Sequence, residues 1–258
     1  MSARQRLDVA LEARGLLPSR ARARDAIRRR TVTVNGTVAE KPGLLVAEGD
    51  VLALDDPAAG YVSRAALKLI AGLDAGQIGV EGKTCLDVGA STGGFTQVLL
   101  ERGAAKVYAV DVGHGQLHPT IAADPRVVPR EGLNARELTT AHVPGPIDLV
   151  VCDVSFVSVT KVLAPALALC RPGAEAAVLV KPQFEAGREH VGKGGIVTDA
   201  GAIERAADAV TAFMEAQGWQ YRLAVPSPIA GGDGNREIVA LFRRRQTRDP
   251  DDPPSRQG

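Results

Sequence analysis

The sequence predicts an α/β protein in which a doubly wound, mostly parallel sheet over residues 63–245 follows a small α+β domain over residues 1–57. From residue 61 onward, apolar strand-like runs alternate with helical stretches, and most of the runs are almost continuously apolar. Strands covered by helices on both faces have this character, and the alternation is typical of a parallel sheet. The first domain instead shows two short helical stretches followed by a hairpin pattern.

The patterning of the small domain predicts a helix–helix–hairpin unit. The stretch RLDVALEARGL has apolar residues at helical spacing, and the stretch SRARARDAIRRR opens on Ser19, a residue type that caps helix N-termini. Apolar and polar residues then alternate over residues 31–43 around Asn35-Gly36, a dipeptide that favours the type I′ turn of a β-hairpin.

The large domain contains six strand-like runs. They are TCLDVG (84–89), KVYAVDVG (106–113), VVPR (127–130), IDLVVCDVSF (147–156), AAVLVKPQF (176–184) and REIVALFRR (236–244). The last run follows a Gly-rich turn, so it is able to run antiparallel to its neighbours. Residues 58–62 are expected to form a linker, and the polar, Pro-containing segment 246–258 is expected to be a disordered tail.

Positive charge is concentrated at the N-terminus. Residues 1–46 hold ten Lys and Arg against four Asp and Glu, a net charge of +6 in a chain whose total is +1. Such an excess indicates a polyanionic partner, although a solvated arginine-rich helix is the alternative. The candidate RNA-binding residues are Arg4, Arg6, Arg20, Arg22, Arg24, Arg28 and, in the large domain, Arg64.

A glycine-rich turn follows the first strand of the large domain, in the stretch LDVGASTGGFTQVLL. In open α/β sheets, ligands bind beyond the carboxyl ends of the strands. The dinucleotide pattern GxGxxG fits imperfectly because Ser91 replaces its second glycine, and the phosphate-loop pattern fails because no lysine follows Gly94. A second glycine-rich segment, residues 192–195, is expected to be a flexible lid or loop.

An acid at the right interval favours an adenosine-containing ligand. Asp111 ends the second strand, 22 positions after Gly89, where a carboxylate can accept hydrogen bonds from ribose hydroxyls. We interpret the turn as a site for S-adenosylmethionine, with strand capping and tight packing as the structural alternatives. Asp87 is expected to orient the turn or to meet an amino group of the ligand, and Asn134 to reach the adenine edge. The candidate cofactor-binding residues are Asp87, Gly89, Ala90, Ser91, Gly93, Gly94, Asp111 and Asn134.

Four charged residues border the strands of the large domain. Asp153 and Lys181 each end a strand, and Glu237 begins the last one. Lys68 lies in the helical stretch SRAALKLIAGL, with Arg64 one turn earlier on the same face. Charges beside apolar strands need partners, so these residues form either a catalytic group or a buried salt-bridge network.

Taken together, these motifs resemble the TlyA family of rRNA methyltransferases over nearly the whole chain. The segments concerned are LDVGASTGGFTQVLLERGA, DVGHGQL, VCDVSFVS, LVKPQFEAG and SRAALKL. The large domain is similar to the FtsJ-type ribose 2′-O-methyltransferases, and the small one to the S4-type RNA-binding domain. The resemblance implies a Rossmann-like fold, S-adenosylmethionine as cofactor, and ribosomal RNA or ribosomal subunits as partner, methylated on a cytidine ribose.

The resemblance also assigns roles and shows two departures. It places the family's catalytic set on Lys68, Asp153, Lys181 and Glu237, with Lys181 as the candidate that activates the 2′-hydroxyl. Some members carry Arg and Trp in the interdomain linker, where this chain has AGYV at residues 59–62. The short C-terminal tail favours large-subunit rRNA, because longer members of the family are those that modify both subunits.

Other features restrict the protein class. The three cysteines form no CxxC pair, so we expect reduced, mostly buried thiols and no metal site. The sequence shows no signal peptide pattern and no apolar run long enough for a membrane helix, which predicts a cytoplasmic protein. The oligomeric state stays open, with a monomer among the options. The rival functions are a non-catalytic RNA-binding protein, a dinucleotide-dependent oxidoreductase and a membrane-damaging haemolysin.

Overall fold

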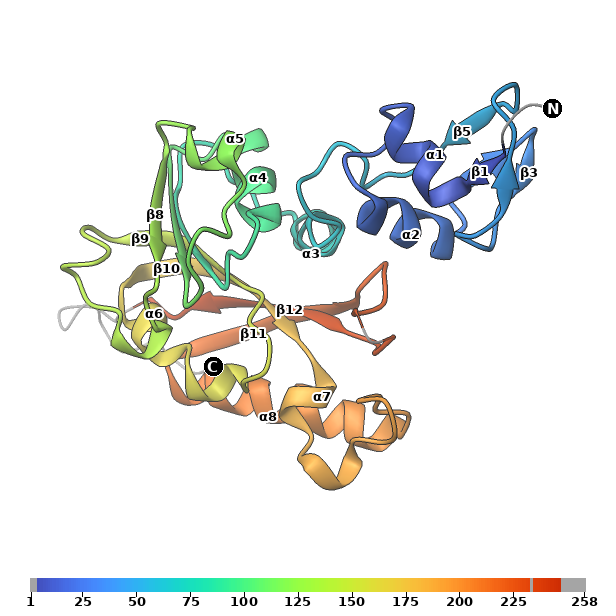
Figure 1. Ribbon diagram of the computed structural model, residues 1–258. Coiled ribbons are helices and arrows are strands. Elements are labelled where there is room, and N and C mark those ends of the chain that lie inside the picture. Colours follow the sequence, from blue (N-terminus) through green and yellow to red (C-terminus); the bar gives the residue numbers. More distant parts are fainter. Residues whose placement is uncertain (1–3, 233, 247–258) are drawn as a thin grey trace, which may run out of the picture. The chain divides into compact units, whose positions relative to one another are not determined.

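The structure, a computed structural model, describes residues 4–232 and 234–246 of the chain (Figure 1). The chain forms two compact units, Met1–Gly60 and Tyr61–Gly258. The division falls within the range 58–62 that the sequence indicates as a linker. Apart from Gln246, the segment predicted to be a disordered tail lies outside the described residues.

The N-terminal unit packs two helices against short antiparallel strands. Its elements are β1 (Gln5–Arg6), α1 (Leu7–Ala13), α2 (Arg20–Arg28), β2 (Val32–Val34), β3 (Thr37–Val38), β4 (Leu45–Val46) and β5 (Leu52–Leu54). Strand β1 pairs with β4, and the order β3-β2-β5 forms a second sheet. Leu11 of α1, Ile27 of α2 and Val32 of β2 are fully buried in a common core. This unit therefore has its own hydrophobic core, as its separate sequence pattern predicts.

Two local predictions in the N-terminal unit are confirmed. Ser19 caps α2, because its Oγ accepts the backbone N–H of Arg22 at 3.3 Å. Asn35 and Gly36 join β2 to β3 with φ angles of 50° and 79°, so both central residues have the positive φ that a type I′ turn requires.

The larger unit is built on a seven-stranded sheet. Its strands are β6 (Thr84–Val88), β7 (Lys106–Asp111), β8 (Val127–Glu131), β9 (Ile147–Cys152), β10 (Cys170–Val180), β11 (Trp219–Pro226) and β12 (Ile238–Arg244). Their order is β11-β12-β10-β9-β6-β7-β8. The five strands from β10 to β8 are parallel, whereas β12 runs antiparallel to both β10 and β11. The predicted doubly wound sheet is therefore present. At one edge it is extended by β12, which runs antiparallel to β10, and by β11, which runs antiparallel to β12.

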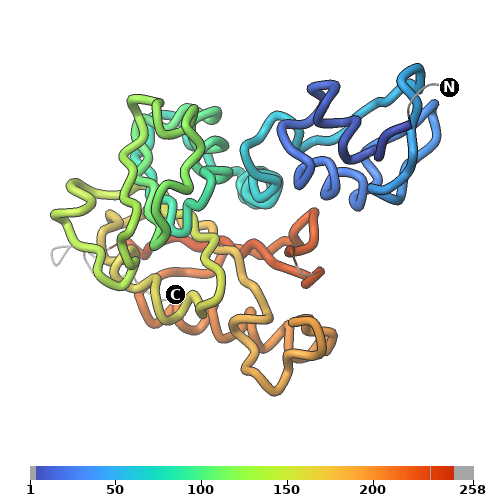
Figure 2. Tube along the Cα trace, in the orientation of Figure 1, coloured from blue at the N-terminus to red at the C-terminus, as the bar shows by residue number. Residues whose placement is uncertain are grey.

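Helices cover both faces of this sheet. They are α3 (Ala66–Gly76), α4 (Gly94–Glu101), α5 (Pro119–Ala122), α6 (Ala164–Ala168), α7 (Pro182–Glu185) and α8 (Ala200–Ala216). One apolar cluster joins the sheet to α3 and α4, and a second joins it to α6 and α8. The chain passes repeatedly from strand to helix between these layers (Figure 2). Helices therefore shield both faces of the sheet from solvent, which explains the continuous apolar runs in the sequence.

Strand β11 was missed by the sequence patterning. Trp219 at its start is fully buried, but most of the following side chains are exposed because β11 is the outer strand and packs mainly through one face. Its interspersed Gln220 and Arg222 therefore hide the strand pattern. Strand β10 also begins earlier than predicted, at Cys170, with an irregularity between Cys170 and Glu175.

The three cysteines, Cys85, Cys152 and Cys170, are buried and free, as predicted. Burial raises the pKa of each thiol to about 12, so each stays protonated at neutral pH.

Substitution of Trp219 tests how much the missed strand contributes to stability. Its ring is fully buried, and its indole N–H has no hydrogen-bond partner among the described residues. We expect Trp219→Ala to lower the free energy of unfolding by about 3–5 kcal/mol. Trp219→Phe should cost clearly less, because it keeps most of the ring and removes an unsatisfied donor. Urea unfolding followed by circular dichroism measures both, and equal losses for the two variants would contradict this assignment.

Candidate active site

The register of the parallel strands brings the glycine turn and Asp153 together. Val88 of β6 pairs with Cys152 of β9, so the residues that follow them, Gly89 and Asp153, leave the sheet side by side. The backbone N–H of Asp153 donates to the carbonyl oxygen of Val88 at 3.0 Å. Two predicted site residues from distant parts of the sequence therefore meet at the carboxyl edge of the sheet.

The antiparallel strand brings in the next pair of residues. Val180 of β10 pairs with Ile238 of β12. Lys181 directly follows β10 and Glu237 directly precedes β12, so the two are next in register at the same edge of the sheet. Opposed residues of an antiparallel pair share a face. An antiparallel β12 is what allows the start of the last strand to reach this edge at all.

Gly89 makes the close approach possible. Its φ is +87°, and a Cβ atom at this position would lie 2.6 Å from the carbonyl oxygen of Asp153, which is far inside van der Waals contact. The later glycines serve packing: a Cβ at Gly93 would lie 2.8 Å from Cδ1 of Leu117, and a Cβ at Gly94 would lie 2.8 Å from Cβ of Ser63. The turn therefore combines a close backbone passage with a tightly packed helix start.

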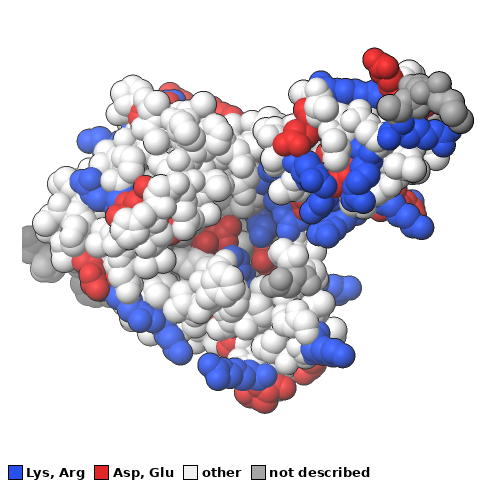
Figure 3. All heavy atoms as spheres, viewed as in Figure 1, with Lys and Arg blue, Asp and Glu red and all other residues white. Residues whose placement is uncertain are grey.

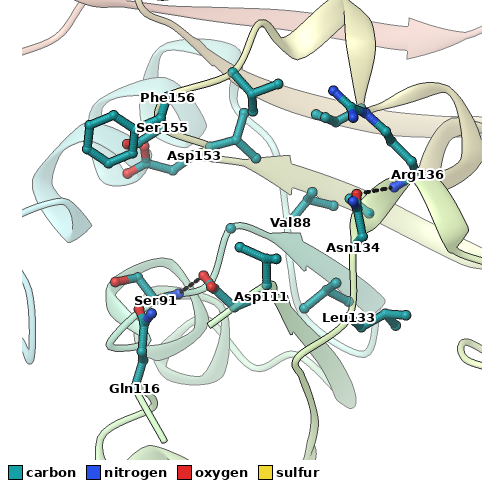
Figure 4. A pocket seen from close by; sticks show the side chains of 17 residues that line it. Val88, Ser91, Asp111, Gln116, Leu133, Asn134, Arg136, Asp153, Ser155 and Phe156 are labelled. Carbon is teal, nitrogen blue, oxygen red and sulfur yellow. Dashed lines mark hydrogen bonds between the residues drawn. The ribbon is translucent and has the colours of Figure 1, made fainter. Parts of the chain in front are cut away.

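A cavity of about 500 Å³ opens beside this turn (Figure 4). Its wall is largely apolar and includes Val88 and Leu133, with a few polar groups that include Ser91, Asp111 and Asn134. Sites for small molecules and cofactors have this size and this composition. The cavity therefore contains three of the predicted cofactor-binding side chains, together with the backbone of Gly89.

Asp111 holds the glycine turn as well as facing the cavity. Its Oδ2 accepts the backbone N–H of Ser91 at 2.8 Å (Figure 4). Its Oδ1 accepts the backbone N–H of Gly113 at 2.8 Å. Each carboxylate oxygen has a second lone pair for a ligand hydroxyl. Asn134 accepts the backbone N–H of Arg136 at 3.1 Å, which orients its amide at the cavity wall.

Glu131, which the sequence analysis missed, shapes the loop after Asp111. Its carboxylate accepts backbone N–H groups of Leu117, Gly115 and Gln116 at 2.7–3.0 Å. These hydrogen bonds hold the pKa of Glu131 below its usual range. Because Gln116 lines the cavity, Glu131 fixes one wall of the site from outside it.

Asp87 does not face either of the two cavities described here. It is fully buried, its Oδ2 accepts the Thr96 hydroxyl at 2.7 Å, and its Oδ1 has no partner among the described residues. Burial raises the pKa of Asp87 to about 7, and the nearby carboxylate of Asp153 adds to this rise. Of its two predicted roles, the geometry matches the orientation of the turn, because the bond to Thr96 ties β6 to α4.

Lys181 lies at the opening beside Gly89. Its Nζ is 2.6 Å from Oδ1 of Asp153 and donates to Oγ of Ser155 at 2.7 Å. All four residues line a second cavity of about 130 Å³, to which Ala90 and Gly94 also contribute. Gly89, Asp153 and Ser155 line the larger cavity too, so the two cavities adjoin. The lysine amine therefore reaches the edge of the proposed cofactor site.

Lys68 and Glu237 form a second buried ion pair. Lys68 projects from α3, and its Nζ donates to Oε2 of Glu237. Neither residue lines the two cavities. The four charged residues therefore occur as two lysine–carboxylate pairs, which satisfies the requirement that buried charges be compensated.

One local prediction around Lys68 is wrong. Arg64 does not lie on the helix one turn before Lys68, because α3 begins only at Ala66. The Oγ of Ser63 accepts the N–H of Ala65 at 3.2 Å, and Ser63 and Arg64 accept three-residue turn bonds from Ala66 and Leu67. This serine-stabilised turn competes with an earlier helix start.

Phe156 is a site residue that the sequence analysis missed. It follows Ser155, lines the large cavity, is 92% exposed and has a φ of +66°. Its ring packs against Phe184, with centroids 5.6 Å apart. Positive φ is costly for a non-glycine residue, and an exposed aromatic side chain gains little burial in return. These two features, which the sequence pattern does not show, make Phe156 a candidate functional residue.

Glu185 joins the segment that follows Phe156 to the segment that follows Lys181. From α7, its carboxylate accepts the Ser158 hydroxyl at 2.6 Å and the backbone N–H of Val159 at 2.8 Å. Burial raises the pKa of Glu185. The segments after β9 and after β10 are thereby joined to one another.

The glycine-rich segment at 192–195 is an irregular loop, as predicted, but it is anchored. Asn235, which is buried, accepts the N–H of Val197 at 2.9 Å and donates to the carbonyl oxygen of Gly195 at 2.8 Å. Since Asn235 lies two residues before Glu237, the loop and the start of β12 are tied together.

The predicted RNA-binding arginines of the N-terminal unit fall into three groups. Arg4 and Arg28 are exposed. Arg22 donates to the carbonyl oxygen of Ala58 at 2.7 Å, a bond within the unit. The third group, Arg6, Arg20 and Arg24, shares one buried carboxylate, that of Asp8.

Comparisons with known proteins agree with this geometry. Residues 61–244 match the FtsJ-like methyltransferase family, and residues 5–52 match the S4 domain. The chain is 45% identical, over 96% of its length and 92% of the relative, to the 16S/23S rRNA (cytidine-2′-O)-methyltransferase TlyA of Mycobacterium tuberculosis. It is 38% identical, over 75% of each chain, to the 23S rRNA (cytidine-2′-O)-methyltransferase TlyA of Campylobacter jejuni. A solved structure called a putative hemolysin, from Streptococcus thermophilus, aligns with a TM-score of 0.75 and 37% identity, covering 95% of this chain and 90% of that one.

The raised pKa of Asp87 predicts a specific dependence of stability on pH. Its folded-state value of about 7 lies above the ordinary 3.8, so protonation of Asp87 stabilises the fold. This stability is complete below pH about 4 and is lost as pH rises through about 7, by at most about 1.4 kcal/mol per pH unit. In Asp87→Asn this component should be absent. Urea unfolding at several pH values, with the exposed Asp208→Asn as control, tests this, and parallel pH profiles of Asp87→Asn and the unaltered protein would rule it out.

Proposed function

The chain belongs to the TlyA branch of the FtsJ-like methyltransferase family, and we propose that it transfers a methyl group from S-adenosylmethionine to the ribose 2′-hydroxyl of a cytidine in ribosomal RNA. The observation that carries this proposal is the position of the Lys181 amine, which shares one cavity wall with Asp153 and Gly89. The names of the TlyA proteins of Mycobacterium tuberculosis and Campylobacter jejuni both include 23S rRNA. Large-subunit rRNA is therefore the proposed substrate, and the proposed compartment is the cytoplasm.

The larger cavity fits the cofactor. The side chain missing at Gly89 leaves backbone exposed for close approach, Asp111 offers acceptors for ribose hydroxyls, and Asn134 offers an amide for the adenine edge. Apolar side chains such as Val88 and Leu133 suit the faces of an adenine ring. S-adenosylmethionine, when bound, supplies a methyl group on a positively charged sulfur.

Lys181 is assigned to the proton of the attacking hydroxyl. A ribose hydroxyl is a weak nucleophile, so its proton must leave as the new O–C bond forms. In its neutral form the Lys181 amine accepts this proton and later releases it to solvent. Asp153 and Ser155 each contact the amine, and this fixes its direction. Holding both reactants in line lowers the barrier further.

The second ion pair is assigned a positioning role. Glu237 is buried at the register position opposite Lys181, and Lys68 is buried beside Glu237. A positive group at this edge of the sheet favours the oxygen that becomes more negative during attack. Glu237 keeps Lys68 in place through their ion pair.

Phe156 is assigned to the RNA substrate. Enzymes that modify RNA read unstacked bases, which stack on aromatic side chains. The Phe156 ring is exposed at the mouth of the large cavity and is supported by Phe184. It therefore offers a platform for a base displaced from its helix.

Three rival functions make different predictions. An oxidoreductase would bind NAD, and a non-catalytic RNA-binding protein would show no methyl transfer. The haemolysin hypothesis follows the name of the Streptococcus thermophilus protein and predicts liposome leakage. Among the described residues, no helix is both long enough and apolar enough to cross a membrane. Incubation with ribosomal subunits and methyl-labelled S-adenosylmethionine, followed by mapping of 2′-O-methyl groups, tests the proposal, and subunits without label would refute it.

Substitution of Lys181 tests the assigned chemistry. We expect Lys181→Ala to slow methyl transfer at saturating substrate by about 100-fold or more, because the proton acceptor is lost. Cofactor affinity, measured by calorimetry, should stay within a few-fold, since Lys181 lines only the smaller cavity. Lys106→Ala is the matched control, because Lys106 begins β7 at the opposite edge of the sheet. An unchanged rate in Lys181→Ala would show that another group takes the proton.

A further inference from the structure

The N-terminal unit contains a buried carboxylate that holds three arginines at once. Asp8, in the first turn of α1, is 0% exposed. Arg6 approaches it with Nε at 3.0 Å from Oδ1 and Nη2 at 3.3 Å from Oδ2, while Oδ2 also accepts Nη2 of Arg20 at 3.3 Å and Nε of Arg24 at 2.9 Å. The arginine side chains themselves are 45–48% exposed. Each guanidinium is therefore anchored on its inner side and open to solvent on its outer side.

We propose that Asp8 is a positioning residue that presents Arg6, Arg20 and Arg24 as one preformed site for the phosphate backbone of RNA. This inference rests on the proposed function. It identifies Asp8 as the group that fixes the positions of the arginines that contact rRNA, in addition to their positive charge.

The charge balance supports a phosphate ligand. One carboxylate among three guanidinium groups leaves a net charge of +2 at the surface, and other basic side chains gather over the helical face of this unit (Figure 3). Burial alone raises the pKa of Asp8, but the hydrogen bonds from Arg6, Arg24 and Arg20 outweigh it and hold the pKa below its usual range. Asp8 is therefore charged, and it keeps the three cations together although they repel one another.

Only arginine suits this arrangement. A guanidinium has five N–H donors in a rigid fork, so it can bond a carboxylate with one edge and a phosphate with another. A lysine ammonium has three N–H donors on one nitrogen, but it lacks the rigid planar fork that directs separate edges at Asp8 and at a phosphate. Each fixed arginine also loses less conformational freedom when RNA binds, because the cost of ordering its side chain has already been met on folding.

The substitution Asp8→Asn separates geometry from charge, because the two make opposite predictions. It raises the net charge of the unit by one, so simple Coulomb attraction predicts tighter RNA binding. Loss of the anchor predicts weaker binding, by about tenfold or more when three long side chains lose their fixed positions. The matched control is Glu12→Gln, one turn later on the same helix, which makes the same change in charge at an exposed position.

Affinity for large ribosomal subunits, measured at fixed salt, decides between these outcomes. The expected result is weaker binding for Asp8→Asn and equal or slightly tighter binding for Glu12→Gln. Equal or tighter binding of Asp8→Asn overturns the inference while leaving the proposed function intact. Failure of the unaltered protein to bind or methylate rRNA overturns both.

A second variant distinguishes loss of the arginine arrangement from a loss of folding stability. Asp8 also joins α1 to α2, so Asp8→Asn is accompanied by thermal unfolding measurements. Arg24→Lys keeps the charge and leaves Asp8 in place, and it should still weaken RNA binding several-fold because the fork is lost. A folded Arg24→Lys protein with undiminished affinity would overturn the inference.

Discussion

The passage of Gly89 against the carbonyl group of Asp153 is the contact on which the rest of the larger unit depends. A side chain at position 89 would lie 2.6 Å from that oxygen, so the two strand ends could not stay together. Because they do, the glycine turn, the carboxylate of Asp153 and the amine of Lys181 share one small cavity that adjoins the larger one. The buried apolar sheet holds the strand ends in place, and the absence of a side chain at Gly89 leaves room for them to approach each other.

Three buried carboxylates of this protein have different kinds of hydrogen-bond and ion-pair partners. Asp8 has three arginines and a lowered pKa, whereas Asp87 has a single hydroxyl donor and a pKa raised to about 7. Glu237, the third of them, has one lysine as its partner. We assign the first arrangement to a site for anions and the third to a positive charge near the reacting oxygen, whereas the second ties β6 to α4.

Much of the fold follows from the sequence, because apolar periodicity and turn chemistry are local. Asn35-Gly36 predicts its hairpin, and the apolar runs ending in Asp111, Asp153 and Lys181 predict strands whose ends meet at one edge. The choice of partners is not local. That Lys181 pairs with Asp153 and Lys68 with Glu237, or that three arginines meet on Asp8, depends on register and helix packing. The positive φ of Phe156 leaves no mark in the sequence, and the edge strand starting at Trp219 is hidden by its exposed face.

The exposed ring of Phe156 separates two tasks in the function that we propose: holding the RNA and receiving the nucleotide that is modified. Residues 1–60 contain no Phe, Tyr or Trp, so that unit has no aromatic surface on which a nucleobase can lie. In the function that we propose, this unit holds RNA through arginine contacts to phosphate groups, which position the chain without reading its bases. The aromatic face lies instead three residues after Asp153. Under this proposal, the surface that holds the RNA and the aromatic ring that receives a displaced base belong to different units of the chain.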